Sequence, residues 1–364
     1  MMLDINNDKL TVVLLIVIAL LGILNLNKDM VGMNVLELGL EDRNFEIKDN
    51  VINLNSLTLK QKIGQMIFTL AKPENKDLLQ EMNVGGIYFW KKNTENTYSN
   101  DIRYFQENME IPFFVGVDLE GCWNPFEDFY KFPMFKEIKD ENEAYELGKE
   151  QGLLLKKLGF NINFSPVVDR EDKIWKCRSF EGDIERKAAY YVRGLQNQGI
   201  IATAKHYPGK TLIGKDPHKD IEFTIINEDD LKPFEWTIKS GVKAVMINHL
   251  ISRGAADSEY KPSVVSKSVI SGLKKDFTGL VLTDEVRMAG LKDFYGDERR
   301  MYVDLVNAGN DVILDFNAEP WHIYKIVAII ENAINLGEIK EDRIDDAVTN
   351  ILKTKGFKVV KRKL

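Results

Sequence analysis

Short apolar runs rich in β-branched and aromatic residues recur from about Leu57, and longer mixed stretches separate them. Apolar runs of about 4–8 residues are typical of buried strands, whereas the longer stretches have the length and spacing of helices. Eight runs fit a strand: 65–70, 85–89, 113–118, 161–169, 200–206, 244–249, 279–284 and 311–316. Candidate helices lie at 141–158, 184–198, 231–240, 265–276, 299–308 and 341–352.

This alternation of strand and helix predicts the fold class. Eight βα units within about 250–300 residues are typical of an α/β protein with a (β/α)8 barrel of the TIM type. A doubly wound parallel sheet is the alternative, but it prefers a glycine-rich first turn, and the chain contains no G-x-G-x-x-G sequence. We therefore predict one barrel domain over residues 56–364.

The N-terminal region has a different pattern. Leu10–Leu24 is apolar except for Thr11 and Gly22, which is short for a membrane span of about 20 residues but fits a signal-peptide core or an uncleaved signal anchor. A buried core helix is the alternative, although such a helix usually has a polar face. We predict an anchor helix in 1–27 and a linker in 28–55. The barrel would then lie outside the cytoplasm on the membrane, or be secreted after cleavage.

Polar residues occupy the C-terminal ends of five predicted strands. They are Asp118, Asp169, the pair Lys205 and His206, the pair Asn248 and His249, and Asp284. Barrel enzymes assemble their active sites at this face of the sheet. The strand interiors are mostly apolar, so solvation alone does not explain the pattern, and it indicates an enzyme.

The loop after the fifth predicted strand contains a candidate proton shuttle. His206 and His218 are two of only four histidines, and Asp216 lies two residues before His218. In such an Asp-x-His pair, the carboxylate can orient the imidazole and raise its basicity, which suits proton transfer near neutral pH. An exposed polar loop is the alternative, but the preceding Lys205-His206 pair at a strand end favours a functional role.

Asp284 is the candidate nucleophile. A carboxylate at a barrel mouth and a proton donor on a loop are the minimum for retaining glycoside hydrolysis, in which one group attacks the anomeric carbon and the other protonates the leaving oxygen. A helix N-cap is the alternative role for Asp284. Four further side chains would suit the binding of sugar hydroxyls: Asp118, Arg178, Lys205 and His206.

Composition limits the classes of partner that the protein is expected to bind. A net charge of −7 gives no basic footprint for nucleic acid, and we expect a carbohydrate substrate, a monomer and no cofactor. Cys122 and Cys177 are the only cysteines, and each adjoins a predicted binding loop. A disulfide between them is possible outside the cytoplasm, but we favour two reduced thiols. The chain lacks the ligand set for a metal site.

Ten short segments occur in the order found in a known family: 62–66, 84–88, 117–121, 165–169, 178–180, 205–209, 216–218, 262–266, 282–288 and 308–311. Over roughly residues 57–355 the chain resembles glycoside hydrolase family 3, in particular its single-domain bacterial β-N-acetylglucosaminidases. The resemblance implies that Asp284 is the nucleophile and that His218, oriented by Asp216, is the acid/base. It also implies that the sugar is held by Asp118, Arg178, Lys205 and His206.

The family's two-domain β-glucosidases lack the Asp-x-His loop, so its presence favours 2-acetamido sugars. The expected function is a retaining exo-glycosidase that releases terminal β-linked N-acetylhexosamine, for example from peptidoglycan fragments. A carbohydrate-binding protein on the same barrel is one alternative. A β-glycoside phosphorylase is the other, because a neutral histidine repels phosphate less than a carboxylate does.

One binding segment departs from the family. The family's E-G-G-R-V-x-R is here Glu120–Phe126, without either arginine, and one of those arginines normally contacts the bound sugar. Trp123 could stack on a sugar face instead, or simply pack against the protein. Lys210, Thr211 and Pro217 also differ from the family loop. The chemistry is therefore expected to be kept, while the preferred sugar is open.

Overall fold

The computed structural model describes residues 45–362 except 46, 212–222 and 318. These residues form one contact unit that begins at Phe45. The predicted anchor in 1–27 lies outside the described residues, as do Asp216 and His218. Within the part that is described, no helix has both the length and the apolar character to span a membrane.

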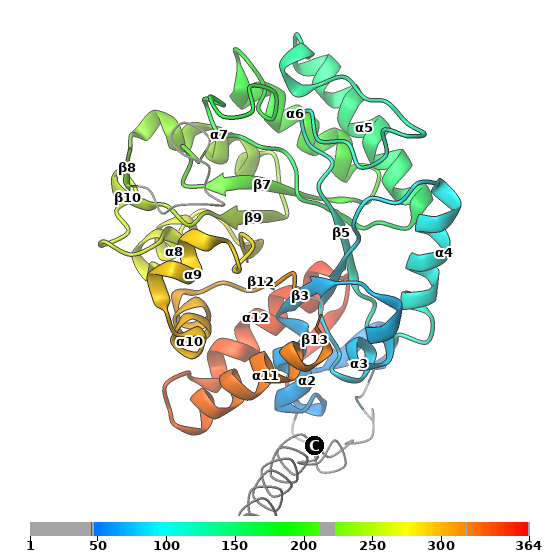
Figure 1. The fold of residues 1–364 in the computed structure, drawn as a ribbon, viewed down its shortest axis with the longest axis vertical. Coiled ribbons are helices and arrows are strands. Elements are labelled where there is room, and N and C mark those ends of the chain that lie inside the picture. Colours follow the sequence, from blue (N-terminus) through cyan, green and yellow to red (C-terminus); the bar gives the residue numbers. More distant parts are fainter. Residues whose placement is uncertain (1–44, 46, 212–222, 318, 363–364) are drawn as a thin grey trace, which may run out of the picture. The chain divides into compact units, whose positions relative to one another are not determined.

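Eight parallel strands form the central sheet, in the spatial order β11-β9-β7-β6-β5-β4-β3-β12. Figure 1 labels β3, β5, β7, β9 and β12 of this sheet. A bridge between Leu282 and Val312 joins the two outer strands and closes the ring. The strands are β3 (Ile67–Leu70), β4 (Gly86–Tyr88), β5 (Phe114–Val117), β6 (Ile162–Asn163), β7 (Ile201–Tyr207), β9 (Ala244–Ile247), β11 (Leu280–Thr283) and β12 (Ile313–Leu314). Each lies within one of the predicted runs or overlaps it, and the predicted (β/α)8 barrel is confirmed.

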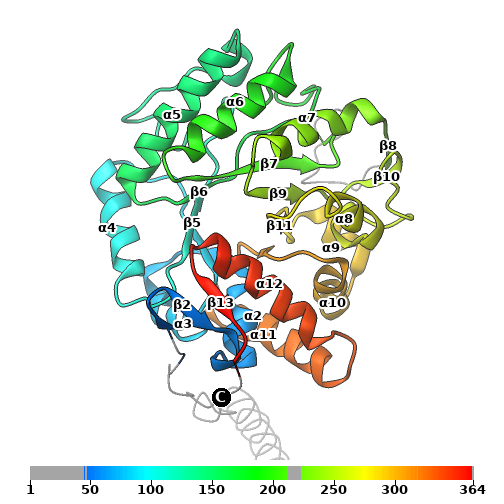
Figure 2. The same cartoon turned by 180° about the vertical axis from the view of Figure 1, so that it is seen from behind.

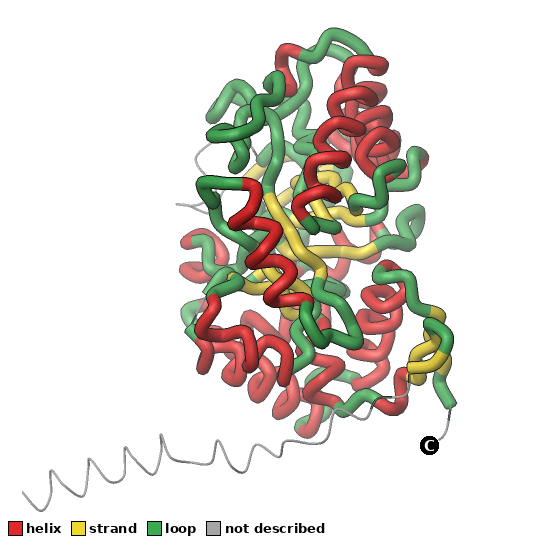
Figure 3. The backbone as a smooth tube through the Cα atoms, turned by 90° about the vertical axis from the view of Figure 1, so that its right-hand side faces the viewer, coloured by secondary structure: helices red, strands yellow, loops and turns green. Residues whose placement is uncertain are grey.

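Helices surround this sheet (Figures 2 and 3). They are α2 (Leu59–Gln65), α3 (Lys76–Glu81), α4 (Glu95–Gln106), α5 (Glu141–Leu158), α6 (Ile184–Gln196), α7 (Glu228–Lys239), α8 (Lys267–Leu273), α9 (Ala289–Tyr295), α10 (Glu298–Ala308), α11 (Pro320–Asn335) and α12 (Glu341–Thr354). The longest, α5, starts where Asp140 accepts hydrogen bonds from two backbone amides and ends at Gly159 with φ +100°.

Aromatic side chains fill the inside of the barrel. The ring of Phe68 occupies the space next to Gly86 and Gly116, where any β-carbon would lie within 2.5 Å of that ring. Phe68 packs edge-on against Phe164, with ring centroids 5.3 Å apart, and Tyr88 stacks on Phe316 at 4.6 Å. These residues make an apolar layer inside the barrel, beneath the C-terminal ends of the strands.

Ordered structure continues upstream of residue 56. β1 (Ile47–Lys48) and β2 (Val51–Asn53) lie in the predicted linker, yet β2 pairs in parallel with β13 (Lys358–Val360) near the C-terminus (Figure 2). Ile52 is fully buried there, so this stretch belongs to the folded unit despite its polar composition. A second small sheet pairs β8 (Phe223–Ile226) with β10 (Ile251–Gly254).

Candidate active site

A cavity of about 670 Å³ lies among the described residues at the C-terminal ends of the strands. This volume is within the range of about 300–1,000 Å³ that is usual for small-molecule sites. The ionisable residues of its wall, apart from Tyr88, are Asp118, Glu120, Arg178, Lys205, His206, Asp284, Glu285 and Arg287. The aromatic residues are Tyr88, Trp90, Trp123, Phe164, Trp175 and Phe316. Five of the seven predicted site residues therefore line one cavity, and the other two are Asp216 and His218, outside the described residues.

A network of ion pairs crosses the cavity floor. Lys205 Nζ lies 2.5 Å from Asp118 Oδ1 and 3.0 Å from Glu120 Oε2. Arg178 donates to Glu120 Oε1 through Nη2 at 2.6 Å and Nε at 3.0 Å, while the Tyr88 hydroxyl donates to Asp118 Oδ2 at 3.1 Å. Burial opposes the charge of Lys205, but Asp118 and Glu120 outweigh it and raise the pKa of this lysine.

Asp169 and Asn248 hold the start of the loop that leads to His218. The buried Asp169 carboxylate lies 3.1 Å from Nδ1 of His206 and accepts from the amide of Thr211 at 2.8 Å. Asn248 donates to the carbonyls of His206 and Gly209, both at 3.2 Å. These two strand-end residues position His206 and the loop, and neither lines the cavity.

Asp284 directly follows β11 and lines the cavity. Burial alone would raise the pKa of Asp284, but the nearby His206, His249 and Lys205 outweigh this effect and lower it. The carboxyl group is therefore ionised at neutral pH, as a nucleophile requires. The alternative role as a helix N-cap does not occur, because the N-cap of α9 is Met288.

The neighbouring Glu285 has the opposite behaviour. Burial, together with the charges of Asp315 and Asp284, raises the pKa of Glu285 to about 7, although its Oε1 accepts a hydrogen bond from the amide of Phe316 at 3.2 Å. Two adjacent carboxyl groups of the cavity thus behave differently: Asp284 stays ionised, and Glu285 titrates near neutrality. Such a separation of carboxyl pKa values is frequent at catalytic sites.

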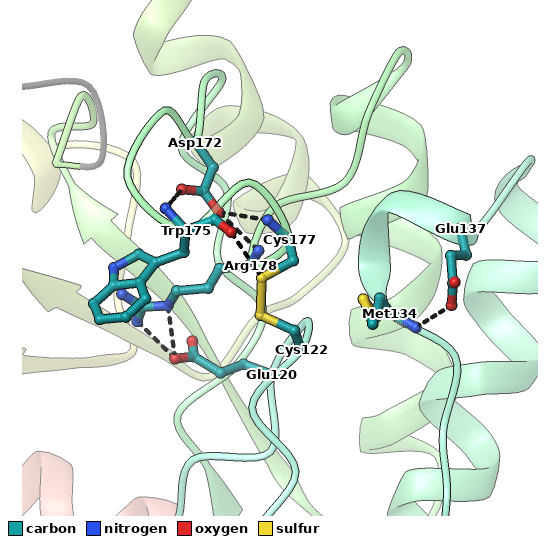
Figure 4. Close-up of a disulfide and its surroundings, with 8 residues drawn as sticks. All are labelled: Glu120, Cys122, Met134, Glu137, Asp172, Trp175, Cys177 and Arg178. Carbon is teal, nitrogen blue, oxygen red and sulfur yellow. Dashed lines mark hydrogen bonds and ion pairs between the residues drawn. A yellow bond between two sulfur atoms is a disulfide. The ribbon is translucent and has the colours of Figure 1, made fainter.

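The preference for two reduced thiols was wrong. Cys122 and Cys177 form a disulfide, with Cα atoms 5.4 Å apart (Figure 4). The two loops meet because Gly121, with φ +50°, lets its backbone approach Arg178, where a β-carbon would lie 2.4 Å from Cα. Asp172 fixes the second loop by accepting hydrogen bonds from backbone amides of the segment 175–178.

The two residues that replace the family arginines in the segment 120–126 lie in different environments. Trp123 lines the cavity and is 56% exposed, whereas Phe126 is fully buried outside it. The Phe126 ring packs against Tyr98, with centroids 5.1 Å apart, and against Phe160 at 5.8 Å. Lys210 does not replace the missing arginines, because its Nζ lies 2.7 Å from the carbonyl of Ile225 in a hydrogen bond that turns it away from the cavity.

Several cavity residues were absent from the predicted site. Glu120 was visible within the motif 117–121, and its spacing from Asp118 puts both at the end of one strand. Tyr88 ends a strand, and Glu285 follows Asp284 directly. Trp90 and Trp175 lie on loops, for which strand periodicity gives no signal. Among the residues that the structure describes, no group of three or more His, Cys, Asp or Glu side chains could hold a metal ion.

Comparison with known proteins gives a consistent result. Residues 58–354 match the family described as the glycosyl hydrolase family 3 N terminal domain. The chain is 31% identical over 345 residues to a beta-N-acetylglucosaminidase/beta-glucosidase from Cellulomonas fimi, covering 81% of this chain and 57% of that protein. It is 28% identical over 269 residues to a beta-hexosaminidase from Xylella fastidiosa, covering 68% of this chain and 80% of the relative.

A solved structure agrees with these relatives. The glycoside hydrolase family 3 beta-N-acetylglucosaminidase from Paenibacillus sp. superposes with a TM-score of 0.77 at 29% identity, over 82% of this chain and 62% of that one. The chain thus spans less than two thirds of the length of the Cellulomonas relative and of this structure.

Proposed function

The chain belongs to glycoside hydrolase family 3, and we propose that it is a retaining exo-glycosidase that releases terminal β-linked N-acetylhexosamine from glycans, with peptidoglycan fragments as the natural substrates. The observation that carries the proposal is the ionised Asp284 in a cavity whose floor is crossed by the ion pairs of Asp118, Lys205 and Arg178. The names of the relatives and the Asp-x-His segment support a 2-acetamido sugar.

The reaction proceeds in two steps. A carboxylate oxygen of Asp284 attacks the anomeric carbon, while His218, oriented by Asp216, gives its proton to the glycosidic oxygen as that bond breaks. Water then enters, His218 takes one of its protons, and the hydroxide displaces Asp284 from the anomeric carbon. Two inversions retain the β configuration.

The floor residues hold the terminal sugar. Asp118 accepts from sugar hydroxyls, since its side chain keeps 24% of its surface exposed while it pairs with Lys205. Arg178 and Lys205 donate, and Glu120 fixes both cations from a side chain only 5% exposed. His206 is held in place by Asp169 and completes the pocket.

The protein is further proposed to act outside the cytoplasm, anchored by Leu10–Leu24. The disulfide between Cys122 and Cys177 supports this location, because disulfides persist in oxidising compartments and are rare in the cytosol. Separation of membrane and soluble fractions tests the anchor, and accessibility of the barrel to protease in intact cells tests the side of the membrane.

A panel of nitrophenyl glycosides, each assayed with and without inorganic phosphate, tests the activity. We expect fastest release from the N-acetyl-β-glucosaminide, with β-N-acetylglucosamine as the first product seen by NMR. Formation of a sugar phosphate would instead establish the phosphorylase. No turnover of any hexosaminide or hexoside would contradict the proposal and leave a carbohydrate-binding protein.

A further inference from the structure

Three of the five tryptophans stand around the same cavity. Trp90 is 57% exposed, Trp123 is 56% exposed and Trp175 is 46% exposed, and all three line the cavity wall. Exposure alone is no signal, because Trp236 and Trp321 are similarly exposed and line no part of it. What distinguishes the three is their convergence at the mouth of one charged cavity.

The depth of the cavity separates the buried ion pairs from the three tryptophans. Lys205 and Glu120, on the floor, have side chains only 3% and 5% exposed, whereas the tryptophans expose about half their surface. In an exo-glycosidase the terminal sugar lies at the closed end, and the leaving group points to the mouth. The indoles are therefore on the side of the leaving group.

The two loops that present Trp123 and Trp175 are fastened together. Trp123 directly follows Cys122, and Trp175 comes two residues before its disulfide partner Cys177 (Figure 4). Trp123 exchanges backbone hydrogen bonds with Glu120, at 3.0 and 2.6 Å.

The second loop is fixed independently of the disulfide. Asp172 accepts from the amides of Trp175 at 2.7 Å, Cys177 at 2.9 Å and Arg178 at 2.8 Å (Figure 4). Burial would raise the pKa of Asp172, but these donors lower it and keep the carboxylate ionised. Both indoles thus project from backbones whose geometry is set before any ligand binds, which reduces the entropy lost on binding.

We propose that Trp123 and Trp175, held by the Cys122–Cys177 disulfide, form a binding subsite for a second sugar ring, the one that leaves, with Trp90 on the same rim. An indole offers a large rigid apolar face to the C–H face of a pyranose, and its N–H remains free for hydroxyls. Trp90 is itself supported by Tyr88, with ring centroids 5.3 Å apart. The preferred substrate is then a glycan of two or more sugars rather than a glycoside with a small leaving group. This rests on the proposed function only for the direction in which the glycan enters.

Turnover of two substrates tests the subsite. N-acetylchitotriose carries sugar rings in its leaving group, whereas methyl N-acetyl-β-glucosaminide carries none. Trp123→Ala and Trp175→Ala should each lower kcat/KM for the chitotriose by about 10- to 30-fold more than for the methyl glycoside, as expected for a buried aromatic contact. Trp236→Ala, an exposed tryptophan on α7, should change neither value. Equal losses on both substrates, or no loss, would overturn the subsite while leaving the hydrolase intact.

Binding separates this proposal from the proposed function. N-acetylchitotriose is titrated into the full chain and its Asp284→Asn variant, and intrinsic tryptophan fluorescence is followed. Saturable quenching, with an affinity that falls by about tenfold in Trp175→Ala, supports the subsite even if no turnover is seen. Unchanged affinity in both tryptophan variants, or no binding to the wild-type chain, overturns it. Reduction of the disulfide should weaken binding in the same way, and an unaffected affinity would refute its role in holding the rim.

Discussion

At the scale of single residues, the cavity floor keeps charges ionised that burial would otherwise neutralise. Lys205 is 3% exposed, yet two carboxylates lie within 3.0 Å of its Nζ and favour its charged form. His206 and His249, and to a smaller extent Lys205, lower the pKa of Asp284 against the effect of burial. In the proposed mechanism, Lys205 therefore contributes both to binding the sugar and to keeping the carboxyl group of Asp284 ionised.

The proposed role of Asp284 as the nucleophile leads to a direct prediction. Asp284→Ala should lower kcat by roughly 10³-fold or more, because no other group stands ready to form the covalent intermediate. Added formate should restore part of the turnover of a nitrophenyl substrate by occupying the vacated space. Asp293→Ala, an exposed change on α9, is the control and should be neutral. A loss below about 100-fold for Asp284→Ala would contradict its role as nucleophile.

Glu285 predicts a dependence of stability on pH. Its pKa is about 7 in the folded protein and 4.5 for the unperturbed group, so the unfolded state loses the proton first as the pH rises. Folded stability therefore falls between pH 4.5 and 7, and the penalty is complete above pH 7. Glu285→Gln removes this penalty. At pH 8 the free energy of unfolding of the variant should exceed that of the wild type by up to about 3 kcal/mol, and at pH 4 the two values should be equal.

Urea unfolding at the two pH values measures this difference. Glu150→Gln, on the exposed face of α5, is the matched control and should show no such trend. A gain in Glu285→Gln that is the same at both pH values would mean that side-chain packing, and not titration, is responsible.

At the scale of elements, the eight barrel strands were predictable because burial on both faces leaves continuous apolar runs. Six of the helices were predictable because they occupy the longer mixed stretches between these runs. The small sheets were not. β2 is three residues long, and its partner β13 lies at the other end of the chain, so neither has a local signal. The long helix α11 was also missed, since it is apolar over most of its length.

Phe126 shows how an element changes the meaning of a sequence difference. By position it replaces a family arginine, yet its ring lies in an aromatic cluster under the loop. Phe126→Arg should therefore lower the free energy of unfolding by about 3–5 kcal/mol and should not raise activity. Trp123→Arg, the same change at the exposed position, should cost less than about 1 kcal/mol. Thermal unfolding of both variants measures the two losses of stability. A Phe126→Arg variant that is as stable as the wild type and more active would contradict the structure.

At the scale of the whole molecule, the candidate site forms because the barrel brings the ends of distant strands to one rim. That principle was enough to predict Asp118, Lys205, His206 and Asp284 from their positions at strand ends. It could not predict Trp90 or Trp175, because these residues lie on loops, and the path of a loop depends on packing that leaves no periodic pattern in the sequence. The disulfide was misjudged for the same reason: the approach of its two loops depends on Gly121 and on the amides gathered by Asp172, which only the folded chain brings together.

The disulfide also ties the stability of the domain to its surroundings. Cys122 and Cys177 are separated by 55 positions in the sequence, so their bond restricts a long loop of the unfolded chain. Cys122→Ser with Cys177→Ser, or treatment with a reductant, should lower the free energy of unfolding by about 2–4 kcal/mol. Urea unfolding with and without reductant measures the effect, and the double variant should not respond to reductant. Wild-type protein that unfolds at the same urea concentration in both conditions, while mass spectrometry shows the bond intact before reduction and open after it, would mean that the link adds no stability and serves only to position the rim.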